Sequence, residues 1–435
     1  MHEIIGRPAM NISTTLPYLK SIRAPGTLSF IARPTALKQV RVKDRICFEP
    51  VIDLDAFRFH AVIDWIDVKV ALGRPTQHQH VQAVLAPLLN RMSYIDPVNA
   101  GPGSVAETFV IRIQEPPPIA TLMDIAETLE TEFGFTAQPV ITAIEISIDA
   151  YPKDGREESR AVLLGAMQRT VFTGRDITTN QNSRPRSVFG KKAPKIAPPA
   201  APVARSTGLT LDNPYLIPWP DEENTSVAVC VRPEQYPAPA IDGTMYLGAE
   251  DDDVMIKLMD KIIDTQHMNG TFVDLPDNRK RVRVEVTLLG KEPARIGLTD
   301  LASLEDFKFT RLQGEYFQFK LPTFADDDGA ASSARSIAKA MHQTNRKIVF
   351  QKAGTVGLMV MDAARKRWRA SEMPNIGTIL IMMGLKKKET NRVGTGTTEA
   401  LTSYNALNKK MALALRDLGH REARAFRKRG GPAIL

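Results

Sequence analysis

Apolar and polar residues alternate strictly in two segments that lie far apart in the chain. In residues 144–149 isoleucine occupies every even position, so Glu145 and Asp149 project from the opposite side of an extended strand. In residues 281–287 valine occupies every even position, and Glu285 shares the other side with two arginines. Both segments therefore predict strands with one apolar and one polar face.

The two polar faces become one surface if the two strands belong to one sheet. Three carboxylates and two guanidinium groups would then face the same side, and such groups hold a divalent metal ion against a phosphodiester. The alternative is an ordinary amphipathic sheet whose solvated face carries salt bridges, because half-solvated antiparallel sheets show the same alternation.

The residues around the first of these segments predict strands and helices in alternation. The expected strands are 61–70, 108–113 and 140–149, and the expected helices are 75–89, 119–133 and 157–170. This order predicts an α+β fold of mostly antiparallel sheets with helices on one face.

A change in composition divides the chain in the middle. Residues 176–212 are rich in proline and lysine and bury too little apolar surface to offset ordering entropy, so they predict a flexible linker that splits the core. Strands are expected after it at 226–231, 244–247, 254–259 and 281–288, short helices at 261–268 and 301–307, and a closing β segment at 307–319. The predicted organisation is an N-terminal segment 1–50, core halves 51–175 and 213–325, and a basic helical extension 326–435.

Length and composition indicate a globular protein of two or three domains, since 435 residues exceed the usual size of one core. Two cysteines cannot build a disulfide framework, which favours a reducing cytoplasm. No apolar run approaches the ~20 residues that span a bilayer, and the first residues lack the pattern of a signal peptide. We therefore expect a cytoplasmic protein with no membrane partner, and the sequence leaves its oligomeric state open.

The formal net charge of +8 conceals an asymmetry along the chain. From Ala331 onward there are 21 lysines and arginines against 6 aspartates and glutamates, which leaves 36 against 43 before that point. Localised positive charge is typical of a protein that binds a polyanion, because each neutralised phosphate releases condensed counterions. A solubilising tail is the alternative, and an anionic membrane surface is a third interpretation without a strongly amphipathic anchor to support it.

Three basic clusters contain much of this charge. One surrounds a tryptophan, whose ring can stack on a base or sugar while the cations bind phosphate. A helix predicted at 399–426 has an apolar stripe, so we expect it to dock on the protein body and present its basic side. The candidate nucleic-acid-binding residues are Arg365, Lys366, Arg367, Trp368, Arg369, Lys386, Lys387, Lys388, Arg424, Arg427, Lys428 and Arg429.

Four short motifs follow one another along the core. The acidic strand 144–149 comes first, residues 243–248 then read Gly-Thr-Met-Tyr-Leu-Gly, residues 256–261 end in Asp-Lys, and residues 281–285 contain Arg-x-Glu. This order resembles that of the replication initiation proteins of filamentous phages and rolling-circle plasmids. The resemblance covers residues 59–321.

The resemblance implies that the protein binds double-stranded origin DNA and nicks one strand. In such initiators a tyrosine hydroxyl attacks the phosphodiester, and Mg²⁺ or Mn²⁺ held by carboxylates stabilises the developing charge. Arg283 is then expected to neutralise the scissile phosphate, with Lys261 as a second catalytic cation. The metal ligands implied by position are Glu145, Asp149, Glu285 and Asp260.

The nucleophile position departs from the family pattern. Met259 stands where the family has tyrosine before Asp-Lys, and methionine cannot act as the nucleophile. Tyr246, in the Gly-x-x-Tyr-x-Gly motif, is then the candidate nucleophile, with a packed sheet tyrosine as the alternative. Three functions remain open: a rolling-circle-type initiator of a phage or mobile element, a catalytically degenerate DNA-binding relative, and a structural or interaction protein with a solubilising basic tail.

Overall fold

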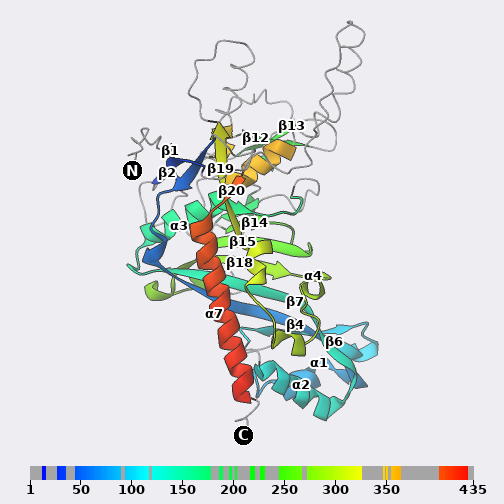
Figure 1. Cartoon of the computed structure of the whole chain (residues 1–435). Helices are drawn as coiled ribbons and strands as arrows, with labels where there is room; N and C mark the ends of the chain where they lie inside the picture. Colours follow the sequence, from blue (N-terminus) through cyan, green and yellow to red (C-terminus); the bar gives the residue numbers. More distant parts are fainter. Residues whose placement is uncertain are drawn as a thin grey trace, which may run out of the picture.

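The computed structural model of the chain describes residues 12–15, 27–35, 45–89, 94–116, 120–177, 186–189, 195–197, 201–202, 216–220, 226–230, 244–266, 272–325, 346–347, 349–350, 354–363 and 401–429. A long, curled antiparallel sheet dominates this part of the chain, and the helix α7 (Asn405–Arg429) runs across its strands (Figure 1). The expected α+β class, with mostly antiparallel sheets, is confirmed.

The main sheet combines strands from both predicted halves of the core. Its order is β10-β9-β14-β15-β18-β7-β4-β6-β5, and all neighbouring strands run antiparallel. The bounds are β10 Lys195–Ala197, β9 Arg186–Phe189, β14 Thr244–Leu247, β15 Val254–Lys261, β18 Arg281–Leu288, β7 Phe135–Pro152, β4 Phe57–Gln77, β6 Val105–Gln114 and β5 Tyr94–Val98. Strands β7 and β18 pair at the centre, so the two halves form one sheet.

Alternation along the central strands gives this sheet an apolar face that packs against helices. Ile146 and Val284 are each 1% exposed on that face. Helix α7 buries Leu407, Met411, Leu415 and Leu418 in the same core, at the spacing of one helical stripe. Two further helices, α2 (Ala120–Phe133) and α3 (Glu157–Thr170), also contribute to this core. None of the described helices is both long and apolar enough to cross a membrane.

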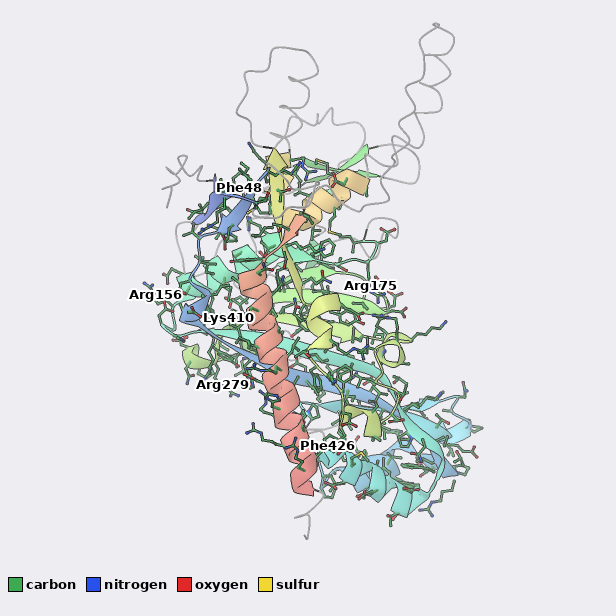
Figure 2. The ribbon with its side chains drawn as sticks, in the orientation of Figure 1. Phe48, Arg156, Arg175, Arg279, Lys410 and Phe426 are labelled. Carbon is green, nitrogen blue, oxygen red and sulfur yellow. The ribbon has the colours of Figure 1, made fainter. Side chains whose placement is uncertain are left out.

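Contacts near both ends of α7 hold it against β4 and the turn that precedes this strand. Near its start, Lys410 forms an ion pair with Asp55 of the turn η1 (Leu54–Ala56), and near its end Phe426 enters the core (Figure 2). Strand β4 pairs with β6 only from Trp65 onward, and Arg421 donates to the Ala61 carbonyl on the preceding edge.

A second sheet packs against the other side of α3. Its order is β1-β2-β3-β19-β20, with β8 (Val171–Phe172) also paired to β19. Its other strands are β1 Ile12–Thr15, β2 Thr27–Pro34, β3 Arg45–Pro50, β19 Gln318–Ala325 and β20 Leu401–Ser403. Phe48 and Phe324 centre its aromatic cluster, with ring centroids 4.9 Å apart, and Ala161 and Ala166 of α3 join that cluster. Part of the predicted N-terminal segment is therefore integral to the fold.

Smaller elements complete the described structure. A three-stranded sheet has the order β11-β13-β12, and β16 pairs with β17 in a separate hairpin. These elements and the short helices are β11 Ala201–Pro202, β12 Leu216–Pro220, β13 Ser226–Cys230, β16 Ile263–Gln266, β17 Phe272–Asp274, α1 His78–Leu85, α4 Glu292–Arg295, α5 Arg311–Glu315, η2 Pro102–Ser104, η4 Asp277–Arg279 and η5 Ala302–Leu304.

Several predicted elements differ from the structure. The helix expected at 399–426 begins only at Asn405, after β20, and the helix expected at 301–307 is reduced to η5. The helix expected at 75–89 begins only at His78, because β4 continues past Pro75. The pairing of β4 with β6 is irregular between Ala71 and Thr76, so Pro75, which has no N–H, needs no hydrogen-bond partner on β6 there. Within the helix expected at 261–268, Lys261 is the last residue of β15 and residues 263–266 form the strand β16. The closing β segment is interrupted by α5, and β19 starts at Gln318.

Candidate functional site

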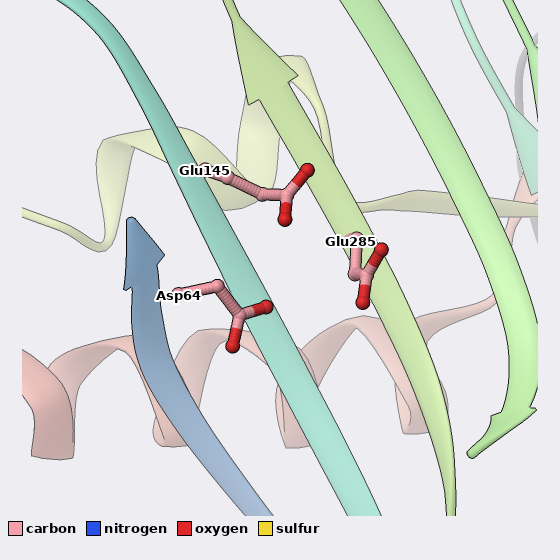
Figure 3. A group of neighbouring side chains, drawn as sticks. All are labelled: Asp64, Glu145 and Glu285. Atoms are coloured by element: carbon pink, nitrogen blue, oxygen red, sulfur yellow. The ribbon is translucent and has the colours of Figure 1, made fainter. Parts of the chain in front are cut away.

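The two acidic segments pair directly in the main sheet. The register places Arg283 opposite Asp149, Glu285 opposite Ser147, and Thr287 opposite Glu145. Directly opposite residues of an antiparallel pair share a face, so these side chains form one polar surface. Figure 3 shows the carboxylates on the side of the sheet opposite α7.

A β-bulge brings a further acid, Asp64, to this surface. In β4, Ile63 pairs with Ile146 and Trp65 pairs with Glu145, so Asp64 is the extra residue between them. The Asp64 carbonyl accepts a 2.6 Å hydrogen bond from the Glu115 backbone N–H, which holds the bulge on its other side. The bulge turns the Asp64 side chain toward the acids of β7 and β18.

Asp64, Glu145 and Glu285 form a compact group from three adjacent strands, which we call the acidic triad (Figure 3). One carboxylate oxygen from each lies within 4.8 Å of the other two. Asp64 also accepts a hydrogen bond from the Ser147 hydroxyl, and Glu145 accepts one of 2.6 Å from Thr287. Neutral hydroxyl donors thus hold two of the carboxylates in place.

Among the described residues, cations contact two members of the triad, Glu285 and Asp64. The Lys257 ammonium lies 2.7 Å from Glu285, and one Arg283 nitrogen lies 3.0 Å from both oxygens of Asp64. The direct hydrogen-bond partner of Glu145 is the Thr287 hydroxyl.

The pKa values of the three triad carboxyl groups shift in different directions, because burial raises them and neighbouring cations lower them. Burial, with the Glu285 charge second, raises the pKa of Glu145 to about 7. Burial also raises the pKa of Asp64, against the opposing effect of Arg283. Burial favours the neutral form of Glu285 as well, but Lys257 and Arg283 outweigh it, so the pKa of Glu285 is lowered.

The triad suits a hard divalent cation. Its donors are all carboxylate oxygens, the ligands preferred by Mg²⁺ and Mn²⁺. Oxygens on opposite sides of one ion at ligand distances of 2.0–2.6 Å lie about 4–5 Å apart. The 4.8 Å limit in the triad therefore allows one ion to contact all three residues. The raised pKa of Glu145 indicates that added positive charge would stabilise its carboxylate form.

Asp149, an implied metal ligand, is held by arginines beside the triad. Its two oxygens accept hydrogen bonds of 2.5 and 2.8 Å from Arg283, and Arg281 approaches one of them to 2.8 Å. Arg283 is thereby directed at Asp149 and Asp64. In this arrangement Arg283 fixes two carboxylates, and its nitrogens are not turned toward solvent.

Asp260, the other implied ligand, lies on the opposite face of the sheet. It pairs in register with Val282, and its side chain forms a buried ion pair of 2.8 Å with Arg160 of α3. The structure therefore does not bring Asp260 to the triad. Lys261 is on the polar face, opposite Arg281, and burial lowers its pKa. Met259 also lies on the polar face, opposite Arg283.

Tyr246 lies on the polar face, in the same cross-strand row as Glu285. It pairs with Lys257, which in turn pairs with Glu285. Two strand spacings place the α-carbons of Tyr246 and Glu285 about 10 Å apart. The Lys257 ammonium lies 5.9 Å from the centre of the Tyr246 ring. The candidate nucleophile is therefore beside the triad, with a cation between them.

Most of the candidate nucleic-acid-binding residues lie outside the described part of the chain. This holds for Arg365, Lys366, Arg367, Trp368, Arg369, Lys386, Lys387 and Lys388. Arg424 and Arg427 are exposed on α7, whose apolar side docks on the sheet as expected. Lys428 and Arg429 belong to the same helix, and their side chains are outside the description.

No protein-family model matches the chain, and no curated protein matches it. Among solved structures, it is similar to a rolling circle replication initiator protein from Geobacillus stearothermophilus, with a TM-score of 0.27 and 10% sequence identity, over 67% of this chain and 97% of that one.

Proposed function

We propose that this protein nicks one strand of DNA at the polar face of its main sheet, as a rolling-circle-type replication initiator. The observation that supports this most strongly is the convergence of Asp64, Glu145 and Glu285 from three adjacent strands. The motif order along the chain and the positive charge after Ala331 favour DNA as the substrate.

In this proposal the acidic triad holds Mg²⁺ or Mn²⁺. A metal ion bound there would supply positive charge to the scissile phosphate and its leaving oxygen. Arg283 has a positioning role, since it fixes Asp64 and Asp149. Asp149 in turn keeps Arg283 aligned. In this proposal Asp149 therefore has a positioning role in place of the metal-ligand role that the motif implies for it.

Tyr246 is the proposed nucleophile. Its phenolic oxygen forms a bond to the phosphorus, the bond from phosphorus to the 3′ oxygen breaks, and a 5′-phosphotyrosine and a free 3′-hydroxyl result. The phenolic proton passes to solvent, and the departing 3′ oxygen takes a proton from solvent. The Lys257 ammonium, 5.9 Å from the centre of the Tyr246 ring, places positive charge beside this side chain.

The test is formation of a covalent protein–DNA adduct. Purified protein is incubated with Mn²⁺ and supercoiled plasmid carrying the candidate origin, denatured, and resolved on a gel. We expect relaxed plasmid and a DNA-linked protein band with the wild type, neither with Tyr246→Phe, and both with the control Tyr94→Phe, since Tyr94 is exposed on the edge strand β5. An adduct that persists with Tyr246→Phe would remove this tyrosine from the mechanism.

A second candidate function is DNA binding without cleavage. The ion pairs of Lys257 with Glu285 and of Arg283 with Asp64 favour it, because they already neutralise two of the three carboxylates. This alternative predicts a mobility shift with DNA, no adduct under any condition, and no heat of Mn²⁺ binding by titration calorimetry. Heat of binding that disappears in Glu145→Gln would instead support the metal site.

A further inference from the structure

The polar face becomes basic beyond the acidic triad. Arg58 of β4 pairs with Tyr151 of β7, and Lys261 of β15 pairs with Arg281 of β18. Because Val282 pairs with Ala150, Arg281 is the cross-strand neighbour of Tyr151. Arg58, Tyr151, Arg281 and Lys261 thus form one row across four strands, which we call the basic row.

Tyr151 spaces the two guanidinium groups of this row. The Arg58 guanidinium lies 5.0 Å from the centre of the Tyr151 ring, and that of Arg281 lies 5.6 Å from it. The Tyr151 hydroxyl is 3.4 Å from Asp149, which restrains the ring. A cation–π contact of this kind leaves the N–H donors at the edge of the Arg58 guanidinium available for other partners. Arg281 directs its Nε at Asp149, 2.8 Å away, and donates from Nη1 to the Arg279 carbonyl.

The basic row holds more positive charge than its surroundings neutralise. Arg281 and Lys261 are directly opposite each other, an arrangement that is destabilising for like charges. The nearest acid, Asp149, is shared: both of its oxygens accept hydrogen bonds from Arg283, and one of them also lies 2.8 Å from Arg281. Within the described residues, Arg58 and Lys261 make no ion pair, and Arg58 is exposed. An anionic ligand would relieve this repulsion.

We propose that the basic row binds backbone phosphates of a nucleic-acid strand and directs that strand to the acidic triad. This inference rests on the proposed function, because the triad is the place where the strand would be cut. Arg281 precedes Glu285 by four residues on one strand, so the row lies about 14 Å from the triad along β18. Phosphodiesters of single-stranded or duplex DNA offer the same chemistry to these side chains.

The test measures DNA binding in EDTA, so that neither the metal ion nor nicking contributes. Fluorescein-labelled single-stranded DNA and a duplex of the same sequence are titrated by anisotropy at several salt concentrations. We expect Arg58→Gln and Lys261→Gln each to raise Kd by roughly three- to tenfold and to reduce the salt slope by about one. If these variants weaken binding of only single-stranded or only duplex DNA, that form is the one that the basic row binds.

Two controls separate this effect from misfolding and from loss of net charge. Arg416→Gln removes one charge from the exposed side of α7, away from the row, and should leave Kd unchanged. Arg58→Lys keeps the charge and should retain most of the affinity. Row variants that bind both DNA forms as tightly as Arg416→Gln overturn the proposal. Because binding is measured without metal, absence of nicking by the wild type would overturn the proposed function and leave this result intact.

Discussion

Glu145 differs from the other members of the acidic triad because its direct partner is a hydroxyl group. Asp64 and Glu285 each have a cation nearby, whereas burial and the Glu285 charge raise the pKa of Glu145 from 4.5 to about 7. Below about pH 7 the metal-free protein therefore keeps a proton on Glu145, and a metal ion binding there would have to displace it.

The stability of the metal-free protein should fall as pH rises through 7. The folded state holds the Glu145 proton more tightly than the unfolded chain does, so the stabilisation is complete below about pH 4.5 and is lost through pH 7. Mg²⁺ prefers the carboxylate, so its affinity should rise roughly tenfold between pH 6 and pH 8. Thermal unfolding with and without Mg²⁺ at both pH values measures this.

Glu145→Gln is the matched control for this pH dependence. The variant should unfold with a flatter dependence on pH, and Mg²⁺ should no longer raise its Tm. An equal Mg²⁺ effect on the wild type at pH 6 and pH 8 would contradict the assignment of the perturbed carboxyl group.

The sequence predicts the faces of single strands but not the partners of each acid. Alternation correctly placed Glu145, Asp149 and Glu285 on one surface. The sequence of β4 also carries a signal for Asp64. Its buried apolar residues occupy odd-numbered positions up to Ile63 and even-numbered positions from Ile66 onward, and this change of phase marks a bulge. That Asp149 pairs with two arginines depends on strand register, which single segments do not specify.

At the level of elements, α3 is enclosed between the two sheets, and its buried ion pair with β15 replaces an apolar contact. Arg160 and Asp260 have side chains that are 4% and 1% exposed. Burial raises the pKa of Asp260 to about 6, even though Arg160 opposes this. The apolar even positions of β15, Val254 to Leu258, already place Asp260 on the core side by alternation.

Removing one partner of this pair should destabilise the protein without affecting the triad. We expect Asp260→Ala to lower the free energy of unfolding by about 3–5 kcal/mol, because Arg160 is left buried and unpaired. Urea unfolding measures the loss, and the rise in Tm caused by Mg²⁺ should persist. Loss of the Mg²⁺ effect from a variant that still folds would show that Asp260 is a ligand after all, as the motif implied.

Helix α7 is held by its apolar stripe, and two leucines allow a matched test of this. Leu415 is fully buried, whereas Leu413 is half-buried two positions earlier. Leu415→Ala should cost about 2–5 kcal/mol of stability, and Leu413→Ala clearly less. Equal losses in urea unfolding would mean that the helix does not dock through this stripe in solution.

At the scale of the whole molecule, the basic C-terminal region is not a separable extension. Strand β20 pairs with β19, and α7 contributes to the main core, so both belong to the folded body. Composition predicts the positive charge after Ala331, and the spacing of apolar residues predicts a helix with an apolar stripe. Neither could predict what the stripe packs on, because that depends on contacts between residues more than 300 positions apart, such as Lys410 with Asp55.

The role of this charge is best tested by substitution, since deletion from Ala331 would remove α7 from the core. Changing Arg365, Lys366, Arg367 and Arg369 together to glutamine should weaken DNA binding and reduce the salt slope by up to about four. As a control, making the same four positions all arginine or all lysine preserves the charge, so this variant should bind DNA as the wild type does. A mobility-shift titration in which the glutamine variant keeps full affinity would assign the charge to solubility.

The central pairing of β7 with β18 also governs when a complete site can exist. Glu285 follows Glu145 by 140 positions, and closing a loop of that length costs of the order of 4 kcal/mol before the strands begin to pair. A nascent chain interrupted before Arg281 lacks one carboxylate of the triad and leaves the apolar β7 edge open to chaperones or to aggregation. Incomplete translation products therefore lack the full set of triad carboxylates, and the site forms only once β18 has been synthesised and paired with β7.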